Sequence, residues 1–144
     1  MVFLGEYVHA IDDKNRLAIP ARFRQDLAEG LYLTKGVDRC LYLLAPDGWN
    51  RLAERIAGLP SMQADVRSLQ RHFFAGAVHL VPDRLGRIVI PQPLRAYADL
   101  DGEVVVAGVH SRVEIWRRET WDQEQARVDQ QTATLAEQMA SLGI

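Results

Sequence analysis

Short apolar runs separated by turn residues dominate the start of the chain. Two of them, residues 7–11 and 17–19, lie on either side of a polar turn at residues 12–15. Strand-length apolar runs on either side of such a turn predict a hairpin. Pro20 closes the second run and is suited to the first position of the helix that is expected next.

The next stretch of sequence alternates helical and strand patterns. Phe23 and Leu27 lie four positions apart, as on one face of a helix, and Asp47 is a suitable N-cap for a later helix. The predicted elements are a helix over 21–28, strands over 31–34 and 40–44, and a helix over 47–58.

The same order of elements then recurs. The second set comprises a strand ending at Val81, a turn at 83–86, a strand over 88–90, a helix after Pro91, and strands over 104–107 and 113–116. Between the two sets, Met62, Val66, Leu69 and Phe73 at helical spacing predict a packed linker helix over 61–76.

The recurrence is an internal repeat. The segment Asp12–Pro20 matches Asp83–Pro91 at an offset of 71 residues, and the same offset pairs Phe3 with Phe74, Gly5 with Gly76 and Arg24 with Arg95. At an offset of 72 the matches are Gly30 with Gly102, Gly36 with Gly108, Val37 with Val109 and Trp49 with Trp121. Repeats of this kind indicate two supersecondary units that bury their apolar faces against each other.

The length decides how the two units combine. A chain of 144 residues holds one core, whereas each half alone would be marginally stable. We therefore expect a first repeat over 1–60, a second over 72–118 and a C-terminal helix over 119–144, sharing one core around a pseudo-twofold axis. Interleaved short strands and helices favour a small mixed barrel with helices outside. Trp49 and Trp121 are expected to anchor equivalent helices.

Composition excludes several classes of protein. No apolar run is long enough to span a membrane, and the N-terminus lacks a signal-peptide pattern, which predicts a cytoplasmic protein. The single cysteine, Cys40, excludes an internal disulfide and a cysteine-based metal site. His9, His72, His79 and His110 have no metal-binding spacing, and no nucleotide-binding or catalytic motif is present. We expect no enzyme activity, cofactor or metal.

Charge is distributed unevenly along the chain. The net charge of −2 and pI near 6.1 give no general signal for nucleic acid. From Glu119 onward the chain carries five acids and only one base, Arg127, so the preceding body is mildly basic. The acidic terminal segment, with apolar residues at mostly helical steps, fits two alternatives: an oligomer contact, or a helix packed on its own subunit.

The repeated turn carries the candidate chemistry. Each copy reads Asp-x-x-x-Arg, and the residue before the arginine is Asn15 or Gly86, both of which tolerate positive φ. The aspartate can bind backbone N–H groups of its own turn or pair with the arginine, so a purely structural role is one alternative. An oriented arginine at a turn is also a donor for phosphate or guanine.

These residues resemble a known family. Two Asp-x-x-x-Arg turns, each followed by an apolar residue, a small residue, an aliphatic residue and Pro, with Phe-x-Gly upstream and an aromatic helix near Trp49, are similar to the MraZ family of bacterial transcriptional regulators. The similarity covers nearly the whole chain. Asn15 replaces the usual first-turn glycine, and Leu85 stands where Lys14 would predict a lysine, with Arg84 supplying the charge.

The resemblance implies a fold and a function. Its fold is α+β, mostly β: two tandem AbrB-like halves of the swapped-hairpin superfamily form one pseudo-twofold, double-psi-like barrel with outer helices. Its function is regulation of the division and cell wall gene cluster, through rings of about eight or more subunits that bind direct repeats in the promoter DNA. Such a protein is expected at the nucleoid, acting by repression or activation.

The resemblance places DNA contacts on the two turns. Arg16 is the first candidate for guanine, since a bidentate arginine discriminates by roughly 1–3 kcal/mol. Arg22 and Arg24 are either phosphate contacts or solvated helix residues. The full candidate set is Asp12, Lys14, Arg16, Arg22, Arg24, Asp83, Arg84 and Arg87.

Two other classes of function are compatible with a chain of this composition. A protein-interaction module or antitoxin-like adaptor on the same fold would use the acidic helix as its contact. A small hydrolase or isomerase would need a deep pocket with converging His and carboxylate groups, which no motif predicts.

Overall fold

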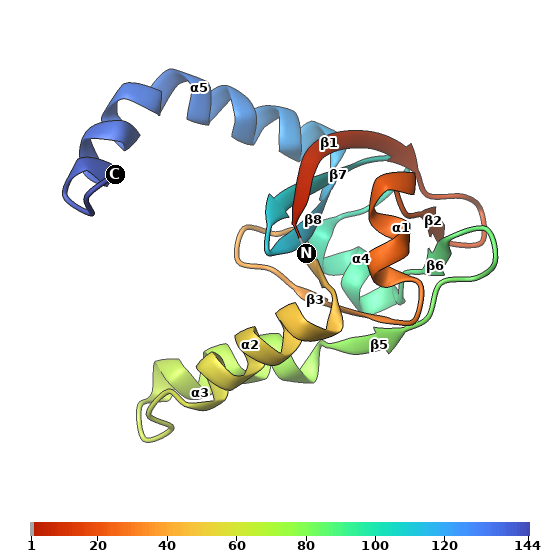
Figure 1. The fold of residues 1–144 in the computed structure, drawn as a ribbon, viewed down its shortest axis with the longest axis horizontal. Helices are drawn as coiled ribbons and strands as arrows, with labels where there is room; N and C mark the ends of the chain where they lie inside the picture. The colour runs from red at the N-terminus through yellow and green to blue at the C-terminus, as the bar shows by residue number, and fades with distance from the viewer. Residues whose placement is uncertain (1) are drawn as a thin grey trace.

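The computed structural model describes residues 2–144, and it contains two sets of elements in the same order (Figure 1). The first set is β1 (Phe3–Ala10), β2 (Arg16–Ala18), α1 (Ala21–Leu27), β3 (Leu31–Lys35), β4 (Leu41–Leu44) and α2 (Pro46–Ala57). The second is β5 (Val78–Leu80), β6 (Arg87–Val89), α4 (Gln92–Ala98), β7 (Glu103–His110), β8 (Arg112–Arg117) and α5 (Arg118–Ala140). Between them lie α3 (Ala64–Gln70) and the π-helical turn η1 (Arg71–Ala75). The linker thus begins later than expected and changes helix type partway.

The two halves exchange strands. β1 of the first half pairs with β7 of the second, and β5 of the second half pairs with β3 of the first, all antiparallel. The prediction that the strands on either side of residues 12–15 pair as a hairpin is therefore wrong. A turn does lie there, but β2 pairs with β6 and not with β1. Since each half completes its sheet with the other half's strand, neither half is a closed unit.

The pseudo-twofold axis is visible in the register of two ladders. In the β2–β6 ladder Leu17 lies opposite Ile88, its own equivalent at the 71-residue offset. In the β4–β8 ladder Tyr42 lies opposite Glu114, its equivalent at the 72-residue offset. A residue can face its own counterpart only where an axis passes between them, so the two predicted repeats are related by a twofold.

The main sheet has six strands in the order β1-β7-β8-β4-β3-β5, and its central strands β7, β8 and β4 are largely buried on both faces. Helices α1 and α4 and the β2–β6 ladder cover one face, where the main core contains residues of the two repeats such as Phe23 and Leu94. All four residues of β4 are buried because its side chains alternate between this core and a second cluster on the other face.

The second cluster lies under α2, η1 and the start of α5. Both tryptophans at equivalent repeat positions pack there: Trp49 stacks on Tyr32 with ring centroids 4.8 Å apart, and Trp121 meets Trp116 edge-on at 5.7 Å. The predicted anchoring role is confirmed, although the anchors are half-buried and belong to the smaller cluster.

The strand ladders of residues 2–144 do not close a barrel. The fold is mixed α+β, as predicted, but β1 and β5 are the two edges of an open sheet, and β2–β6 forms a separate two-stranded ladder. One physical reason is the shortness of β5: residues 71–75 are taken up by η1, so only three residues remain as strand where β1 has eight.

The helical arms point away from the β2–β6 end of the molecule. Figure 1 shows α5 and the α2–α3 pair extending from the side opposite the two turns that precede β2 and β6. None of the helices in the described part of the chain is long and apolar enough to cross a membrane.

Candidate nucleic-acid interface

The first Asp-x-x-x-Arg turn is held by one carboxylate. Asp12 Oδ1 accepts hydrogen bonds from the backbone N–H groups of Lys14 and Arg16, each at 2.9 Å. Its other oxygen, Oδ2, accepts from Arg16 Nε at 2.7 Å. The carboxylate therefore both shapes the turn and orients the guanidinium, so two roles that the sequence left as alternatives occur together.

The second turn repeats this geometry. Asp83 Oδ1 accepts from the N–H groups of Leu85 and Arg87 at 2.9 Å, and Oδ2 accepts from Arg87 Nε at 2.9 Å. The substitution of Leu85 for a lysine leaves this pattern intact, because Leu85 takes part through its backbone.

Residues in the left-handed backbone conformation allow the two turns to share one shape. Asn15 has φ of 61° and Gly86 has φ of 76°, which confirms the expectation for both positions. Their carbonyl groups then bridge the halves: Gly86 O accepts from Ile19 N–H at 2.8 Å, and Asn15 O accepts from Ile90 N–H at 3.0 Å. Each turn is thus fixed to the strand that follows the other turn.

The β2–β6 ladder brings the two arginines onto one face. Leu17 and Ile88 point into the core, so their neighbours Arg16 and Arg87 point outward. Arg16 lies opposite Val89, and residue 87 is two positions along, which makes the arginines diagonal neighbours at roughly 7–8 Å between backbones. Two residues separated by 71 positions in sequence therefore form one surface.

Both guanidinium groups remain accessible. The side chains of Arg16 and Arg87 are 28% and 29% exposed. Only Nε of each is used in the turn; within residues 2–144 the terminal nitrogens form no further hydrogen bond. These nitrogens are the pair that a guanine edge or a phosphate would engage.

Arg24 supports the second turn from the first half. Its Nε donates to Ile19 O at 2.8 Å, and its side chain lies so close to Gly86 that a Cβ there would sit 2.5 Å from Nε. Arg95, its equivalent, donates from Nη1 to the corresponding carbonyl, Ile90 O. Arg24 therefore has a structural contact that the sequence analysis did not foresee, while it also stays exposed to solvent.

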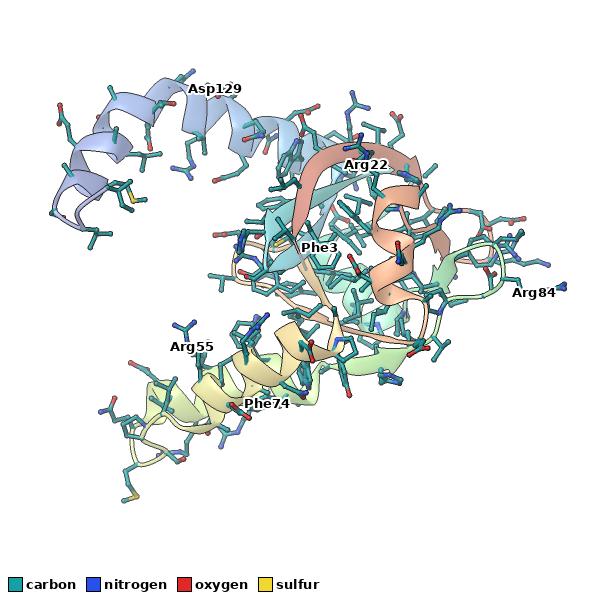
Figure 2. The ribbon with its side chains drawn as sticks, viewed as in Figure 1. Phe3, Arg22, Arg55, Phe74, Arg84 and Asp129 are labelled. Atoms are coloured by element: carbon teal, nitrogen blue, oxygen red, sulfur yellow. The ribbon has the colours of Figure 1, made fainter. Side chains whose placement is uncertain are left out.

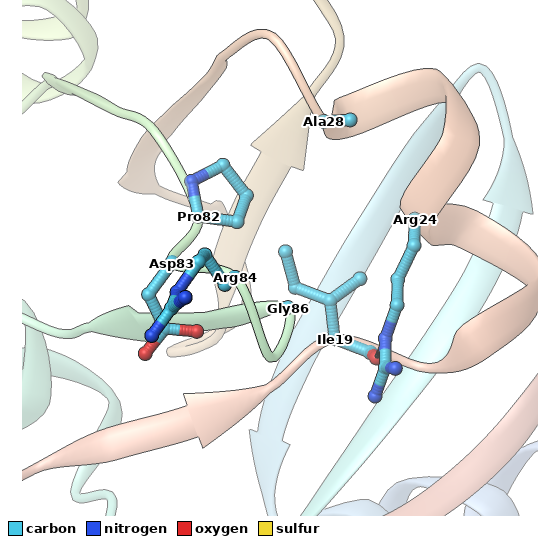
Figure 3. Close-up of a pocket in the computed structure, with 7 residues that line it drawn as sticks. All are labelled: Ile19, Arg24, Ala28, Pro82, Asp83, Arg84 and Gly86. Atoms are coloured by element: carbon cyan, nitrogen blue, oxygen red, sulfur yellow. Dashed lines mark hydrogen bonds between the residues drawn. The ribbon is translucent and has the colours of Figure 1, made fainter.

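A shallow pocket of about 150 Å³ lies between α1 and the second turn (Figure 3). Ile19, Arg24, Pro82, Asp83 and Arg84 are among its lining residues. Pockets for small-molecule ligands are usually several times larger. The arrangement suits a backbone group that rests on the surface, such as a phosphate, better than an enclosed cofactor.

The remaining candidate bases lie at different places. Lys14 and Arg84 are exposed residues of the two turns, and Figure 2 shows Arg84 at the extreme end of the molecule, away from Asp129 on α5. Arg22 lies in the first turn of α1 and is set apart from Arg84 in the same view. We call the two turns together with Arg24 the basic tip; it contains five bases and three acids.

The turn carboxylates have lowered pKa values. The backbone N–H of Arg16 is the main cause for Asp12, followed by the Arg16 side chain, and Arg87 acts in the same two ways on Asp83. A lowered folded-state pKa stabilises the turn at pH values above the ordinary aspartate pKa, and this contribution is lost as the pH falls through the folded-state value.

We therefore expect both turns to stay ordered in mild acid and to loosen only below the ordinary aspartate pKa of roughly 3.9. The measurement is the pH dependence of the Lys14, Arg16, Leu85 and Arg87 amide signals by NMR. The variant Asp12→Asn should remove the acid transition from the first turn and leave that of the second, which is the internal control. Identical behaviour of both turns in this variant would contradict the assignment.

The other potentially reactive side chains are buried or held in structural contacts. Burial raises the pKa of the Cys40 thiol to about 12, which keeps it protonated. His72 Nε2 lies 2.8 Å from Gly36 O, and His79 packs on Tyr32. Among residues 2–144 no group of three or more His, Cys, Asp or Glu side chains is arranged to hold a metal ion.

Two further residues, Val89 and Arg95, contribute to this region but were not among the predicted site residues. Val89 is 54% exposed and lies directly opposite Arg16, two residues from Arg87 on the same face of the ladder. Arg95 fixes the end of β6 as Arg24 fixes the end of β2. The match of Arg24 with Arg95 in the repeat was a usable signal for the second; no pattern along the chain could place Val89 beside Arg16, because the β2–β6 pairing creates that contact.

Fold and site together define a tandem, strand-swapped protein whose halves present equivalent Asp-Arg turns at one end. The chain matches a family model described as "MraZ protein, putative antitoxin-like" twice, over residues 2–72 and 73–142. It is 47% identical over 143 residues to the transcriptional regulator MraZ of Moorella thermoacetica, covering 99% of this chain and 100% of that protein. The identity is 43% over 143 residues for the protein of the same name from Syntrophomonas wolfei, with the same coverage. For that of Roseiflexus castenholzii it is 45% over 141 residues, 98% of this chain and 99% of the other.

The chain therefore belongs to the MraZ family of transcriptional regulators. The resemblance inferred from the turns is confirmed. The expectation that this is a regulator and not an enzyme is confirmed by the same relatives.

Proposed function

We propose that this protein is a sequence-specific DNA-binding regulator that uses the basic tip to read direct repeats in the promoter of the division and cell wall gene cluster. The observation that carries the proposal is the shared outward face of Arg16 and Arg87. It supports DNA as the ligand because paired, oriented guanidinium groups suit guanine edges and phosphates.

The β2–β6 register places the two arginines as diagonal neighbours on one face, so a single stretch of duplex can meet both side chains. Val89, directly opposite Arg16, offers an apolar surface for a thymine methyl group. We assign Arg16 and Arg87 to base contacts, and Lys14, Arg84 and the free nitrogens of Arg24 to phosphates. Arg22, which lies apart from the tip, is assigned to flanking phosphate.

Asp12 and Asp83 act indirectly in this proposal. Each carboxylate holds the Nε side of its arginine and leaves the terminal nitrogens to the DNA. Without that restraint a free arginine side chain would lose rotamer entropy on binding. The aspartates are therefore positioning residues.

One subunit has too little charge to bind DNA strongly. The chain has a net charge of −2, and the tip's five bases are offset by three acids. Strong binding then requires several tips acting together, since joining weak binding sites in one assembly raises the overall affinity even when each site is unchanged. We propose a homo-oligomeric ring of about eight or more subunits whose tips engage successive repeats. The protein would then act at the nucleoid in the cytoplasm.

The test is a titration of the full-length protein against the promoter region of that cluster at two salt concentrations. Binding should fall steeply with salt, by roughly 10³-fold or more between 50 and 200 mM for six or more phosphate contacts. Light scattering on the same sample gives the subunit number. A monomer that ignores this DNA, or binding unaffected by salt, would contradict the proposal.

A protein-interaction adaptor is the second candidate. It is favoured by the words "antitoxin-like" in the family description and by the acidic α5, which carries no buried residue. This alternative requires a tight protein partner bound through α5, and DNA binding that does not respond to changes in the basic tip. The two candidates therefore make opposite predictions for Arg16 variants.

A further inference from the structure

A second arginine-rich surface lies away from the basic tip, between α2 and the turn that joins β7 to β8. Arg51 and Arg55 of α2 and Arg112 of β8 surround a groove of about 280 Å³. Tyr42, Leu44 and Leu52 also line it. We call this the α2 groove. Its mixture of apolar and cationic lining suits an acidic, amphipathic segment.

Two of the three arginines form no ion pair within residues 2–144. Arg112 pairs with Glu114 at 2.7 Å and lies over the Tyr42 ring at 4.7 Å. Arg51 and Arg55 are exposed, and neither forms an ion pair with any residue of the described chain. The groove therefore carries positive charge that the subunit itself does not neutralise.

The distal part of α5 has the complementary character. Trp121, Val128 and Leu135 of α5 recur every seven residues, the spacing of a seam that packs against a partner, and Leu142 continues this spacing in the turn after the helix. Trp121 packs on its own subunit, whereas the three later residues belong to neither apolar cluster formed by residues 2–144. Met139, four residues after Leu135, is 42% exposed, and Leu142 is 72% exposed. Figure 1 shows this part of α5 leading away from the sheet.

Charge selects the occupant of the groove. From Val128 to Ala140 the helix carries two acids, Asp129 and Glu137, and no base, and Asp129 directly follows a seam residue. The three earlier acids of α5 pair with arginines of the same subunit. Two α5 helices packed together would bring like charges close, which is unfavourable. An α5 helix laid in the α2 groove would instead place its carboxylates near Arg51 and Arg55.

We propose that α5 of one subunit docks in the α2 groove of the next copy, so that the subunits join head to tail. This inference rests on the ring of the proposed function and names the surfaces that form it. A head-to-tail contact is heterologous and closes into a ring when the rotation allows. The helix from Val128 to Ala140 is only about 20 Å long, so each contact is small, and ring closure strengthens it by holding every subunit twice.

The test mixes two defective variants of the full chain. The groove variant combines Arg51→Glu and Arg55→Glu, and the tail variant combines Met139→Glu and Leu142→Glu. All four residues are exposed, so each variant should fold, as circular dichroism would verify. Alone, each should assemble at least tenfold more weakly, within the range seen when interfacial charges are changed. Mixed in equal amounts, they should form a one-to-one complex, because one retains a working helix and the other a working groove.

The control is Arg71→Glu, which reverses an exposed charge on the neighbouring η1 surface and should leave the assembly intact. If the native protein forms a ring and both defective variants still form it, or if their mixture stays unassembled, the docking contact is wrong but the ring of the proposed function stands. Loss of assembly only in the tail variant would indicate pairing of α5 helices and would also overturn the docking contact. A native monomer would overturn the ring and this contact together.

Discussion

Arg16→Ala should abolish the preference for the cognate repeat while leaving the fold intact. The loss of one bidentate base contact corresponds to roughly 1–3 kcal/mol, or about tenfold for each 1.4 kcal/mol. Because several subunits of a ring engage the DNA together, the loss at each site multiplies in the avidity. The measurement is competition between cognate and unrelated duplexes at fixed salt, with light scattering to verify the assembly.

Two matched variants separate base reading from charge. Arg16→Lys keeps the charge but loses the planar fork, so it should lose discrimination and retain most salt-dependent affinity. Arg71→Ala removes an exposed charge on η1, outside the basic tip, and should change neither. If Arg16→Ala bound the cognate repeat as selectively as the parent protein, Arg16 would not contact bases, and Arg87 would become the first candidate.

The repeat predicted more of this fold than local propensity did. Matching Asp12–Pro20 to Asp83–Pro91 placed two equivalent turns, and positive φ at Asn15 and Gly86 followed from residue type alone. Strand partners could not be predicted in the same way. An adjacent apolar run is the natural partner for β2, yet strand exchange between equivalent units is equally compatible with the same pattern. The result was the wrong hairpin.

The site shows the same division between local and long-range information. The Asp12–Arg16 pairing is contained within one turn and was expected as one alternative. Arg16, Arg87 and Val89 lie close together because of the β2–β6 register. Arg24 lies against Gly86 because α1 contacts the turn of the other half. Such contacts join residues far apart in the chain, and only the folded structure brings them together.

Gly108→Ala is expected to destabilise the protein more than any other glycine substitution in the sheet. Gly108 lies opposite Gly5 in the β1–β7 ladder, and a Cβ at Gly108 would lie 2.4 Å from Leu4 N and 2.5 Å from Phe3 C. These are backbone atoms, so no side-chain rotation relieves the clash, and β1 must move. Phe3, which packs edge-on against Phe23 at 5.2 Å, would be drawn from the core. We expect a loss of about 3 kcal/mol in the free energy of unfolding.

Two other glycines give graded controls for this substitution in urea unfolding. At Gly36, the repeat equivalent of Gly108, a Cβ would meet the Tyr42 ring at 2.6 Å. The one backbone atom in its way is Cys40 O at 2.9 Å, whereas Gly108 faces three backbone atoms within 2.8 Å, so Gly36→Ala should cost less. Gly102 has open space around its Cβ position but φ of 69°, so alanine there should cost only the left-handed strain of about 1–2 kcal/mol. Hydrogen exchange should show lost protection in β1 for Gly108→Ala alone. Because β1 leads directly into the Asp12 turn, Gly108→Ala should also weaken DNA binding. If Gly108→Ala and Gly102→Ala were equally stable, β1 and β7 would not approach as closely at Gly108 as the structure indicates.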